Sequence, residues 1–329
     1  MTERSAEDWR PTAGLDGLRR RAEILATIRA FFAERGVLEV DTPLLAASTV
    51  TDVHLESVAC QLPLAGRPTT FYLQTSPEFA MKRLLAAGSG AIYQLAKAVR
   101  SDERGRHHNP EFTMLEWYRP GYDHRQLMAE VDDLAQAVLG TPSAERLSYG
   151  DAFLRHAEVD PHRADVAELR RAARRTSFDV DAFGDETDRD FWLHVLGSQL
   201  VEPHLGVGRP TLLFDYPASQ AALARIRPGR GGSPAVAERF ELYIDGVELA
   251  NGFHELLDAE EQRRRFENDL RERRERKLPE GPVDERLLAA LWHGLPPCAG
   301  VALGVDRLVM LAAGADAIDE VIAFPIERA

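Results

Sequence analysis

Two carboxylates on a short predicted hairpin have the spacing of a cation site. The segment "FELYIDGVELANGFHEL", residues 240–256, alternates apolar and polar residues on both sides of Asp245-Gly246, a dipeptide typical of a tight hairpin turn. Glu241 and Glu248 fall on the two arms, where they could be cross-strand neighbours on one face. Two such carboxylates repel each other unless a cation lies between them, and their hard oxygens suit Mg²⁺. The alternative is a pair of glutamates that face solvent on an edge hairpin.

An arginine at the start of a predicted helix indicates a nearby anion. In "GVALGVDRLVMLAAG", Gly300 and Gly304 form a predicted buried turn before an apolar helix, so Asp306 and Arg307 fall in its first turn. The helix dipole favours Asp306 there and disfavours Arg307 by a few tenths to about one kcal/mol. A phosphate at the site would remove this penalty, because helix N-termini and guanidinium groups both bind phosphate. A salt bridge to a neighbouring carboxylate is the alternative.

The segment "GRHHNPEFTMLEWYRP", residues 105–120, has the pattern of a pocket wall. Asn109-Pro110 predicts a turn, and Phe112 then offers an aromatic face. Glu116 and Tyr118 are two residues apart, so on a strand they share one face. An acidic wall of this kind suits a positively charged substrate.

The low number of cysteines bears on disulfides and on structural zinc sites of the cysteine type. Cys60 and Cys298 are the only cysteines, which excludes a disulfide framework and a Cys₄ or Cys₂His₂ site and is typical of a reducing cytoplasm. His107 and His108 are adjacent, and neighbouring side chains on an extended chain face opposite ways, a poor arrangement for one metal ion.

Charge and hydropathy exclude several classes of partner. The formal net charge of −13 repels nucleic acids and anionic membranes on average, so a bound anion needs a local cluster of cations. The arginine-rich helix predicted over 259–277 interleaves glutamates at helical spacing, which favours a solvated face over a nucleic-acid patch. No signal peptide or membrane span is indicated, and we expect a cytoplasmic protein.

The elements that must position these residues follow from periodicity and turn signals. Helices are predicted over 15–35, directly after "TSPE" and at several places in 121–240, with Ser76 or Thr75 as cap and Glu78 in the first turn of the second helix. Glu78 could therefore act only by stabilising that helix N-terminus. A short strand is predicted in "VLEVDTPLL", where Pro43 limits how far pairing can continue. A hairpin is predicted within 53–74, a strand in "AIYQLAKAVRSDE" and a loop in "RIRPGRGGSPAVAERF".

The chain resembles the catalytic core of class II aminoacyl-tRNA synthetases, and specifically that of the lysyl type. Arg100 begins a segment similar to the second class II motif, in which His108, Phe112 and Glu116 keep the later spacing, and "GVALGVDRL" resembles the third. "TSPE", "RHHNPEFTMLEWY" and "ELANGFHEL" resemble the lysyl type in particular. The resemblance implies an α+β fold with an antiparallel β-sheet flanked by helices. It implies a flexible segment over 1–14 and one catalytic domain over 15–329, with a helical insertion around 121–235.

The same resemblance implies an ATP site with Arg100 and Arg307 as its catalytic residues. Arg100 would contact the α-phosphate, Arg307 the γ-phosphate, and Phe112 the adenine. Glu241 and Glu248 would hold Mg²⁺. The other implied ATP-binding residues are Ser101, Asp102, Glu103, His108, Asn109, Glu248, Leu249 and Gly304.

For the amino acid, the resemblance implies a site for two ammonium groups. Glu78 and Glu116 would bind one of them, and Tyr118 and Glu255 the other. The remaining implied substrate residues are Ser76, Pro77, Asn251 near the carboxylate, and Ala302. The implied chemistry is attack of a carboxylate on the α-phosphorus of ATP, which gives an aminoacyl-adenylate and pyrophosphate.

Three departures from the lysyl pattern refine the expectation. Arg100-Ser101-Asp102 replaces the usual Arg-x-Glu, and because Glu103 follows, either acid could take the glutamate's role. Ala302 stands where lysyl enzymes usually carry glycine, and one methyl group can change selectivity by about 10- to 200-fold. The anticodon-binding domain that precedes the lysyl core has no counterpart here, which makes tRNA an unlikely partner.

With "VTDVHL", "ASQAALA" and Ala302, the chain resembles the short lysyl-tRNA synthetase paralogues that ligate (R)-β-lysine to elongation factor P. This implies (R)-β-lysine or lysine as substrate, a lysine side chain of elongation factor P as acceptor, and a homodimer through residues 18–45. There are two alternatives. One is a truncated lysyl-tRNA synthetase that charges tRNA with α-lysine, and the other is a non-catalytic binding paralogue. Pseudoenzymes commonly lose active-site residues, whereas Arg100, Glu241, Glu248 and Arg307 are all present.

Overall fold

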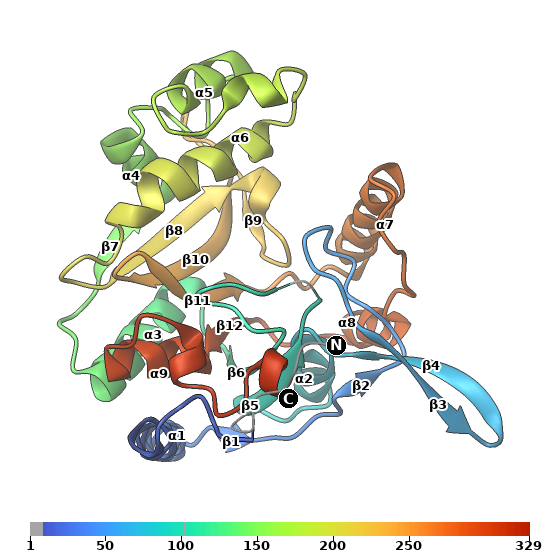
Figure 1. The fold of residues 1–329 in the computed structure, drawn as a ribbon. Coiled ribbons are helices and arrows are strands. Elements are labelled where there is room, and N and C mark those ends of the chain that lie inside the picture. The colour runs from blue at the N-terminus through green and yellow to red at the C-terminus, as the bar shows by residue number, and fades with distance from the viewer. Residues whose placement is uncertain (1–8, 102) are drawn as a thin grey trace, which may run out of the picture. The chain divides into compact units, whose positions relative to one another are not determined.

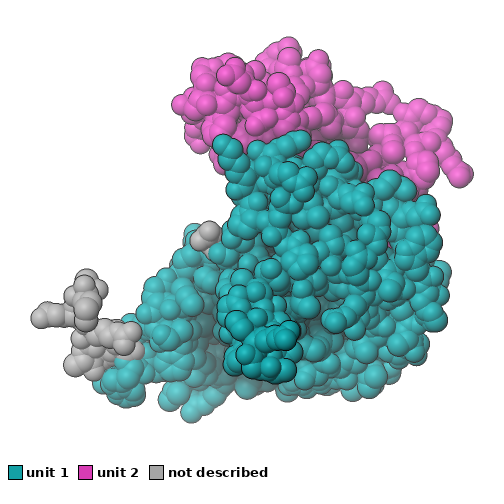
Figure 2. Space-filling model, turned by 90° about the vertical axis from the view of Figure 1, so that its right-hand side faces the viewer, with its two compact units in different colours: residues 1–121, 257–297, 302–329 teal, residues 122–256, 298–301 magenta. Residues whose placement is uncertain are grey.

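The computed structural model describes residues 9–101 and 103–329. Residues 1–8 of the predicted flexible segment, and Asp102, lie outside the described residues. The chain divides into two compact units, coloured separately in Figure 2. Unit 1 comprises residues 1–121, 257–297 and 302–329, and unit 2 comprises residues 122–256 and 298–301. A single catalytic domain over 15–329 stays a prediction.

Unit 1 contains the following elements, labelled in Figure 1: α1 (Leu15–Glu34), β1 (Leu38–Glu39), β2 (Leu45–Ala46), β3 (Ala59–Leu64), β4 (Arg67–Leu73), α2 (Glu78–Ala86), β5 (Ile92–Val99), β6 (Glu111–Pro120), α7 (Ala259–Glu275), α8 (Glu285–His293), the end of β12 (Cys298–Gly304) and α9 (Val305–Ala313), followed by 3₁₀ turns η5 (Ile318–Glu320) and η6 (Ile326–Arg328). β5 pairs antiparallel with β6 and parallel with β1. β2, β4 and β3 form a separate antiparallel sheet in that order.

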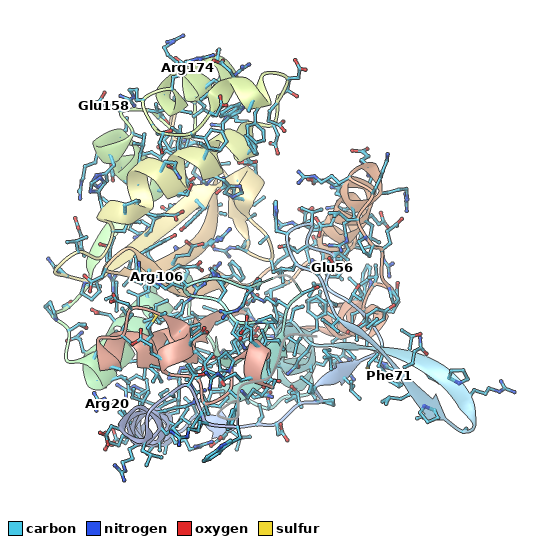
Figure 3. All side chains as sticks on the ribbon, in the orientation of Figure 1. Arg20, Glu56, Phe71, Arg106, Glu158 and Arg174 are labelled. Atoms are coloured by element: carbon cyan, nitrogen blue, oxygen red, sulfur yellow. The ribbon has the colours of Figure 1, made fainter. Side chains whose placement is uncertain are left out.

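Apolar residues at helical spacing anchor α1 to the strands of unit 1. Phe32 is fully buried and stacks on Tyr93 of β5 with 4.4 Å between ring centroids. It also meets Trp117 of β6 edge to face at 5.3 Å. The opposite face of α1 is solvated, as the outward-pointing Arg20 shows in Figure 3. The predicted helix over 15–35 is thus confirmed, and Gly36 with φ of 64° follows its end.

One prediction for unit 1 needs correction and two are confirmed. The short strand expected in "VLEVDTPLL" is present as β1, and pairing is interrupted before β2 in the stretch that contains Pro43, as expected for a residue that lacks the N–H of a continuous ladder. The turn expected before Asp306 is the extended strand β12, and α9 begins directly after Gly304. The hairpin expected within 53–74 is confirmed as β3 and β4, joined at Ala65-Gly66 with φ of 49° and 77°.

Unit 2 contains α3 (His124–Leu139), β7 (Glu145–Ser148), α4 (Tyr149–His156), α5 (Val166–Ala173), η1 (Val180–Phe183), α6 (Arg189–Leu196), a π turn η2 (Gly197–Val201), η3 (Glu202–His204), β8 (Thr211–Pro217), η4 (Ala218–Gln220), β9 (Ile226–Arg227), β10 (Val236–Ile244) and β11 (Val247–His254), together with the start of β12. Its strands follow the order β11-β10-β8-β7, and β9 also pairs with β10. All of these pairs are antiparallel except β7 with β8. Both units thus combine helices with mainly antiparallel strands, and the predicted α+β class is confirmed.

The stretch 121–240 is less helical than its sequence suggests. The helix predicted from "HRQLMAEVDDLAQAVL" is confirmed as α3. The helical pattern "RDFWLHVLGSQLVEPHL" forms α6 only as far as Leu196, and a π turn and a 3₁₀ turn follow. β7, β8 and β9 also lie in this stretch, and the sequence analysis missed them. The loop predicted in "RIRPGRGGSPAVAERF" is wrong at both ends, where β9 and the first residues of β10 form. β8 is largely buried and only seven residues long, so its apolar run has no periodicity to separate it from a helix. It supplies Leu213 to the core cluster of unit 2.

The hairpin that carries the predicted cation ligands is confirmed. β10 and β11 are joined by Asp245 and Gly246, with φ of 50° and 74°, as a turn of the mirror-image type requires. Among the described residues, no helix is both long and apolar enough to span a membrane.

Candidate active site

The acidic wall predicted in unit 1 is present and buried. Glu116 and Tyr118 lie on β6, and each is only 2% exposed. The Tyr118 hydroxyl donates to Glu116 Oε1 at 2.7 Å, as expected for two residues on one strand face. The Ser76 hydroxyl, which lies just before α2, donates to Glu116 Oε2 at 2.6 Å. Both carboxylate oxygens of Glu116 are therefore oriented by hydroxyl groups.

Glu78 lies beside this carboxyl group but already has a cationic partner. Its backbone N–H donates to the Ser76 hydroxyl at 3.0 Å, which places it at the start of α2 directly after Pro77. Its Oε1 accepts from the Lys82 ammonium at 2.5 Å, one helical turn away, and Lys82 is 2% exposed. The sequence analysis missed Lys82, although its i,i+4 spacing from Glu78 on a predicted helix was the available signal.

The environment of Glu116 disfavours its negative charge in the free protein. Burial, followed by the nearby Glu78 carboxylate, raises the pKa of Glu116 from its ordinary 4.5 to about 8, although the Ser76 and Tyr118 hydroxyls and Lys82 act in the opposite direction. A carboxyl group held neutral in this way gains a partner when an ammonium group arrives. The site can therefore bind a cation with release of a proton.

This raised pKa predicts how stability depends on pH. Between about pH 4.5 and 8 the folded protein holds a proton on Glu116 that the unfolded chain has lost, so the free energy of unfolding falls as pH rises. One such group contributes at most about 1.4 kcal/mol per pH unit. We expect Glu116→Gln to flatten this dependence by about that slope, measured by urea denaturation from pH 5 to pH 8. A slope equal to that of the unsubstituted protein would show that Glu116 is ionised throughout this range.

Arg100 extends from the end of β5 and is held by neighbouring polar groups. Its Nε donates to the Thr75 carbonyl oxygen at 3.3 Å, and one terminal nitrogen lies 3.3 Å from Glu103 Oε1. Its guanidinium lies 5.1 Å from the ring centroid of Phe112, within cation–π range. The residues predicted to contact phosphate and adenine are therefore neighbours. Ser101, which follows Arg100, is partly exposed.

Arg307 lies at the start of α9, where it contacts the loop before β6. Its Nε donates to the His107 carbonyl oxygen at 3.2 Å, and a terminal nitrogen lies 2.6 Å from His108 Nε2. Burial, followed by the Arg307 charge, lowers the pKa of His108. Because arginine only donates, His108 accepts through Nε2 as a neutral imidazole. The nearest atom to a Cβ added at Gly304 would be in the Arg307 side chain, at an ordinary 3.6 Å, so packing alone does not require glycine there.

Two buried polar side chains fix the backbone around Arg307. Asp306 is 3% exposed, accepts from the Thr113 backbone N–H at 2.6 Å, and pairs with Arg21 of α1 at 2.5 Å. It ties the start of α9 to β6 and α1. Asn109, predicted to contact ATP, uses its side-chain amide within the protein, donating to the Glu111 carbonyl and accepting from the Ile326 N–H.

In unit 2, a register shift aligns the predicted cation ligands. Glu241 is paired with Asn251, and Glu248 is paired with Tyr243, because the β10–β11 register shifts between Leu242 and Tyr243. Glu241 and Glu248 are therefore diagonal neighbours on one face, not directly opposite each other. Leu249, the predicted ATP contact, lies at this shift, between Glu248 and Ala250, and is not aligned with a residue of β10.

Glu241 has partners that the sequence analysis did not identify. Arg239 lies 2.5 Å from Glu241 Oε1, and the Tyr243 hydroxyl donates to Oε2 at 2.7 Å. The Asn251 amide reaches Oε1 at 3.4 Å. The spacing Arg239, Glu241, Tyr243 along one strand was the available signal, since alternate residues share a face. These contacts orient the carboxylate.

The donor set around Glu241 fits Mg²⁺. Burial, followed by Glu241 and then Glu248, raises the pKa of Glu202 to about 7. Three carboxyl groups thus lie within one another's field, and a divalent cation would relieve their repulsion. The ligands offered are hard oxygens, which Mg²⁺ prefers. Glu202, from η3, is a further candidate that the sequence analysis did not name.

The remaining predicted substrate residues are placed as follows. Glu255 is buried and directly follows β11 in unit 2. Ala302 lies on β12 in unit 1 and is half-buried. Whether any of these residues binds substrate stays a prediction.

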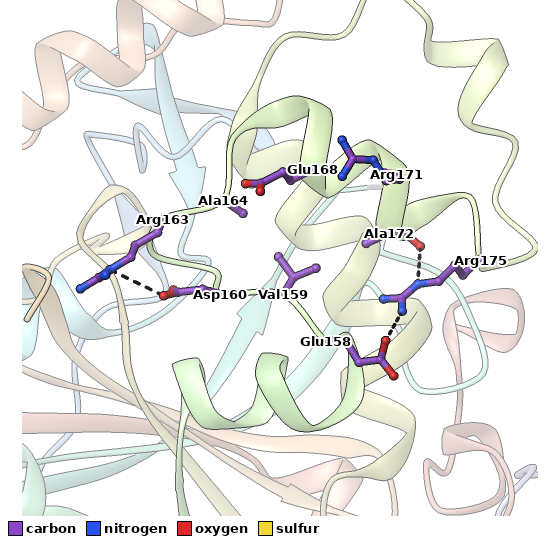
Figure 4. Close-up of a pocket in the computed structure, with 9 residues that line it drawn as sticks. All are labelled: Glu158, Val159, Asp160, Arg163, Ala164, Glu168, Arg171, Ala172 and Arg175. Atoms are coloured by element: carbon purple, nitrogen blue, oxygen red, sulfur yellow. Dashed lines mark hydrogen bonds and ion pairs between the residues drawn. The ribbon is translucent and has the colours of Figure 1, made fainter.

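A cavity of about 420 Å³ lies elsewhere in unit 2, between the loop after α4 and helix α5 (Figure 4). Its charges are balanced within the wall, because Arg175 pairs with Glu158 and Arg163 pairs with Asp160. The cavity therefore lacks the uncompensated charge and convergent polar groups of a reaction site.

Comparison with known proteins identifies the family of this chain. The model of the family "tRNA synthetases class II (D, K and N)" matches residues 5–328. Proteins from Yersinia enterocolitica and Pectobacterium carotovorum are 56% identical over 98% of this chain and 98% of their own length, and one from Salmonella typhi is 55% identical over the same shares. All three are named "Elongation factor P--(R)-beta-lysine ligase". With a family model that spans almost every residue and relatives of this similarity, the chain belongs to the class II tRNA synthetases of the D, K and N group.

Proposed function

We propose that this protein activates (R)-β-lysine with ATP and transfers it to a lysine side chain of elongation factor P. The observation that carries the proposal is the buried Glu116 carboxyl group, oriented by Ser76 and Tyr118 in the unit that also holds Arg100 and Arg307. Such a group selects an ammonium ion, and the arginines suit the phosphates of ATP. The relatives named above act, by their names, on elongation factor P and (R)-β-lysine.

The reaction takes place in two steps. A carboxylate oxygen of the amino acid attacks the α-phosphorus of ATP, and the bond to pyrophosphate breaks. The neutral amine of the acceptor lysine then attacks the adenylate carbonyl carbon, AMP leaves, and the amine loses a proton. Arg100 and Arg307 stabilise charge on the phosphates, so positioning and neutralisation account for most of the rate enhancement. Glu241 and Glu248 would hold Mg²⁺, which supplies further charge neutralisation when bound.

The proposal is tested by mixing the protein with ATP, Mg²⁺, (R)-β-lysine and elongation factor P, and weighing the acceptor by intact mass spectrometry. A mass increment of one lysyl group is expected, and it should disappear when the acceptor lysine is replaced by arginine. Incubation with tRNA and α-lysine in parallel tests the alternative. Efficient tRNA charging without modification of elongation factor P would overturn the proposal.

We further propose a homodimer through the segment 18–45. Three large apolar side chains in or beside this segment are exposed: Leu38 at 55%, Leu44 at 41% and Leu15 at 68%. Exposed apolar side chains are typical of an interface where they join in one patch, and a dimer contact would cover these three. Light scattering should give twice the 36.6 kDa chain mass, and a monomer mass at micromolar concentration would contradict this.

Ala302 is predicted to set the preference between lysine isomers. Ala302→Gly removes one methyl group from the proposed pocket, and we expect the kcat/KM ratio of α-lysine to (R)-β-lysine in pyrophosphate exchange to rise by about 10-fold or more. Ala299→Gly is the matched control, because it lies on the same strand three residues earlier and faces the other side. An unchanged ratio in Ala302→Gly would show that this methyl does not select the isomer.

A further inference from the structure

A cluster of metal-ligating side chains lies in unit 2, and none of its members has a role in the proposed reaction. His124 begins α3, Glu238 lies on β10, and His254 ends β11. One ligand atom from each lies within 4.8 Å of the others. α3 packs against β10 and β11, which brings together residues more than a hundred positions apart (Figure 1). Within the described part of the chain, this is the only such group of three or more His, Cys, Asp or Glu residues.

Four polar atoms of this cluster and the neighbouring Asp215 are buried and lack hydrogen-bond partners. His124 is 2% exposed, and neither of its ring nitrogens has a partner. His254 Nδ1 lies 2.9 Å from Glu238 Oε2 but without hydrogen-bond geometry. Asp215 Oδ1 is also without a partner and lies 3.7 Å from His124 Nε2. Buried polar groups are rarely left unpaired, so these atoms indicate an absent ion or water.

The backbone directs Asp215 into the cluster. Asp215 has a φ of 60°, a left-handed conformation that is unfavourable for a residue with a side chain. It lies on β8 where the register with β10 shifts between Ala237 and Phe240, opposite Glu238. Irregularities of this kind re-aim side chains within a sheet. Asp215 Oδ1 thus lies near His124, but Asp215 would have to move to act as a fourth ligand, because it is not among the residues whose ligand atoms all lie within 4.8 Å of one another.

Neighbouring arginines orient the two carboxylates. Arg225 lies 2.6 Å from Glu238 Oε2, and Arg227 lies 2.6 Å from Asp215 Oδ2. Arg227 also approaches Glu238 at 3.5 Å, as Arg125 does Asp215. A carboxylate has about four lone-pair positions, so it can accept from an arginine and still bind a metal ion. The arginines, 40–53% exposed, and the N-terminus of α3 oppose a cation, so we expect micromolar affinity rather than tighter binding.

We propose that His124, Asp215, Glu238 and His254 bind one divalent ion of the zinc class. Two imidazoles with two carboxylates suit Zn²⁺ or Co²⁺, whereas Mg²⁺ prefers oxygen ligands alone. The ion would join α3, β8, β10 and β11 as a structural clasp. The clasp would act on the stretches of β10 and β11 that lead to Glu241 and Glu255.

The test uses full-length, tag-free protein stripped with a chelator and titrated with Zn²⁺ in excess Mg²⁺, followed by calorimetry and thermal unfolding. One equivalent of Zn²⁺ should bind and raise Tm, and Co²⁺ should give the intense visible absorption of a four-coordinate site. His124→Ala should lose both signals. His124→Gln, which keeps a polar side chain, should lose them too if His124→Ala folds poorly. His162→Ala, a partly buried histidine of the same unit outside the cluster, is the matched control and should retain both.

The outcomes separate a metal site from a hydrated cluster. Absence of stoichiometric Zn²⁺ binding in the unsubstituted protein would show that water alone satisfies these atoms and would overturn the proposal. Equal binding by the His124 variants would place the ion elsewhere and would also overturn it. The measurements need neither ATP nor elongation factor P, so their result is independent of the proposed ligase activity.

Discussion

Arg307→Ala is expected to lower kcat/KM for lysine-dependent pyrophosphate exchange by about 10³-fold or more, while leaving Tm unchanged or slightly higher. An arginine that neutralises phosphate charge in the transition state contributes on this order. Arg307 does not stabilise the fold in the same way, because a cation in the first turn of α9 opposes the helix dipole. Its removal should therefore leave the free energy of unfolding unchanged or slightly higher. Pyrophosphate-exchange assays measure the effect on kcat/KM, and calorimetric unfolding of the same preparation measures the effect on Tm.

Two further variants give this prediction its controls. Arg307→Lys keeps the charge but loses the planar pair of donors, so we expect partial recovery only. Arg264→Ala removes an exposed arginine of α7 that pairs with Glu261, and exchange should stay within about twofold because exposed pairs contribute little. A Tm that falls by many degrees in Arg307→Ala, or exchange that persists, would show that the His107 and His108 contacts are structural and not part of ATP binding.

Glu116→Gln should weaken binding of the lysine substrate by about 30-fold or more, with little change in the KM for ATP. Truncating one partner of a buried, hydrogen-bonded charge pair costs about 2–5 kcal/mol. Glutamine keeps the shape of the side chain and can still bond Ser76 and Tyr118, so the effect isolates the charge. Initial-rate exchange kinetics with each substrate varied in turn distinguish the two KM values.

Proton uptake and release provide a second readout for Glu116. In the unsubstituted protein near neutral pH, binding of the cationic substrate should release a proton, since the pKa of about 8 falls when an ammonium arrives. Calorimetry in buffers of different ionisation enthalpy measures this release, which Glu116→Gln should abolish. Glu111→Gln, on the same strand but exposed and paired with Lys97, is the matched control and should behave as the unsubstituted protein. Equal proton release in Glu116→Gln would assign it to another group.

Local sequence patterns predicted the elements that carry chemistry. The hairpin β10–β11 follows from alternation around Asp245-Gly246, and α9 follows from an apolar helical period after Gly304, because both signals lie within a few residues. β7, β8 and β9 could not be predicted in the same way. β8 is largely buried and shows no regular polar face, whereas β7 and β9 are only four and two residues long, too short to show a period.

For the candidate site, the sequence indicated the charges but not the groups that neutralise them. Glu116 and Arg307 were identified from their spacing within single motifs. The contact between Asp306 and Arg21 joins residues 285 positions apart, and no local pattern encodes it. Which carboxyl groups carry charge depends on burial and on such long-range partners. The raised pKa values of Glu116 and Glu202 therefore required the structure.

The ion pair between Lys82 and Glu78 also limits how this pocket can evolve. Converting the site to a neutral or acidic substrate would require the loss of its acids, but removing Glu78 would leave a buried ammonium without this partner. Breaking a buried pair on one side costs about 3–5 kcal/mol, a large part of the stability of an ordinary domain. Glu78 thus contributes both to the choice of substrate and to the stability of the fold. A change of substrate that removes Glu78 must therefore replace Lys82 as well, and replacing Glu78 alone is expected to destabilise the protein.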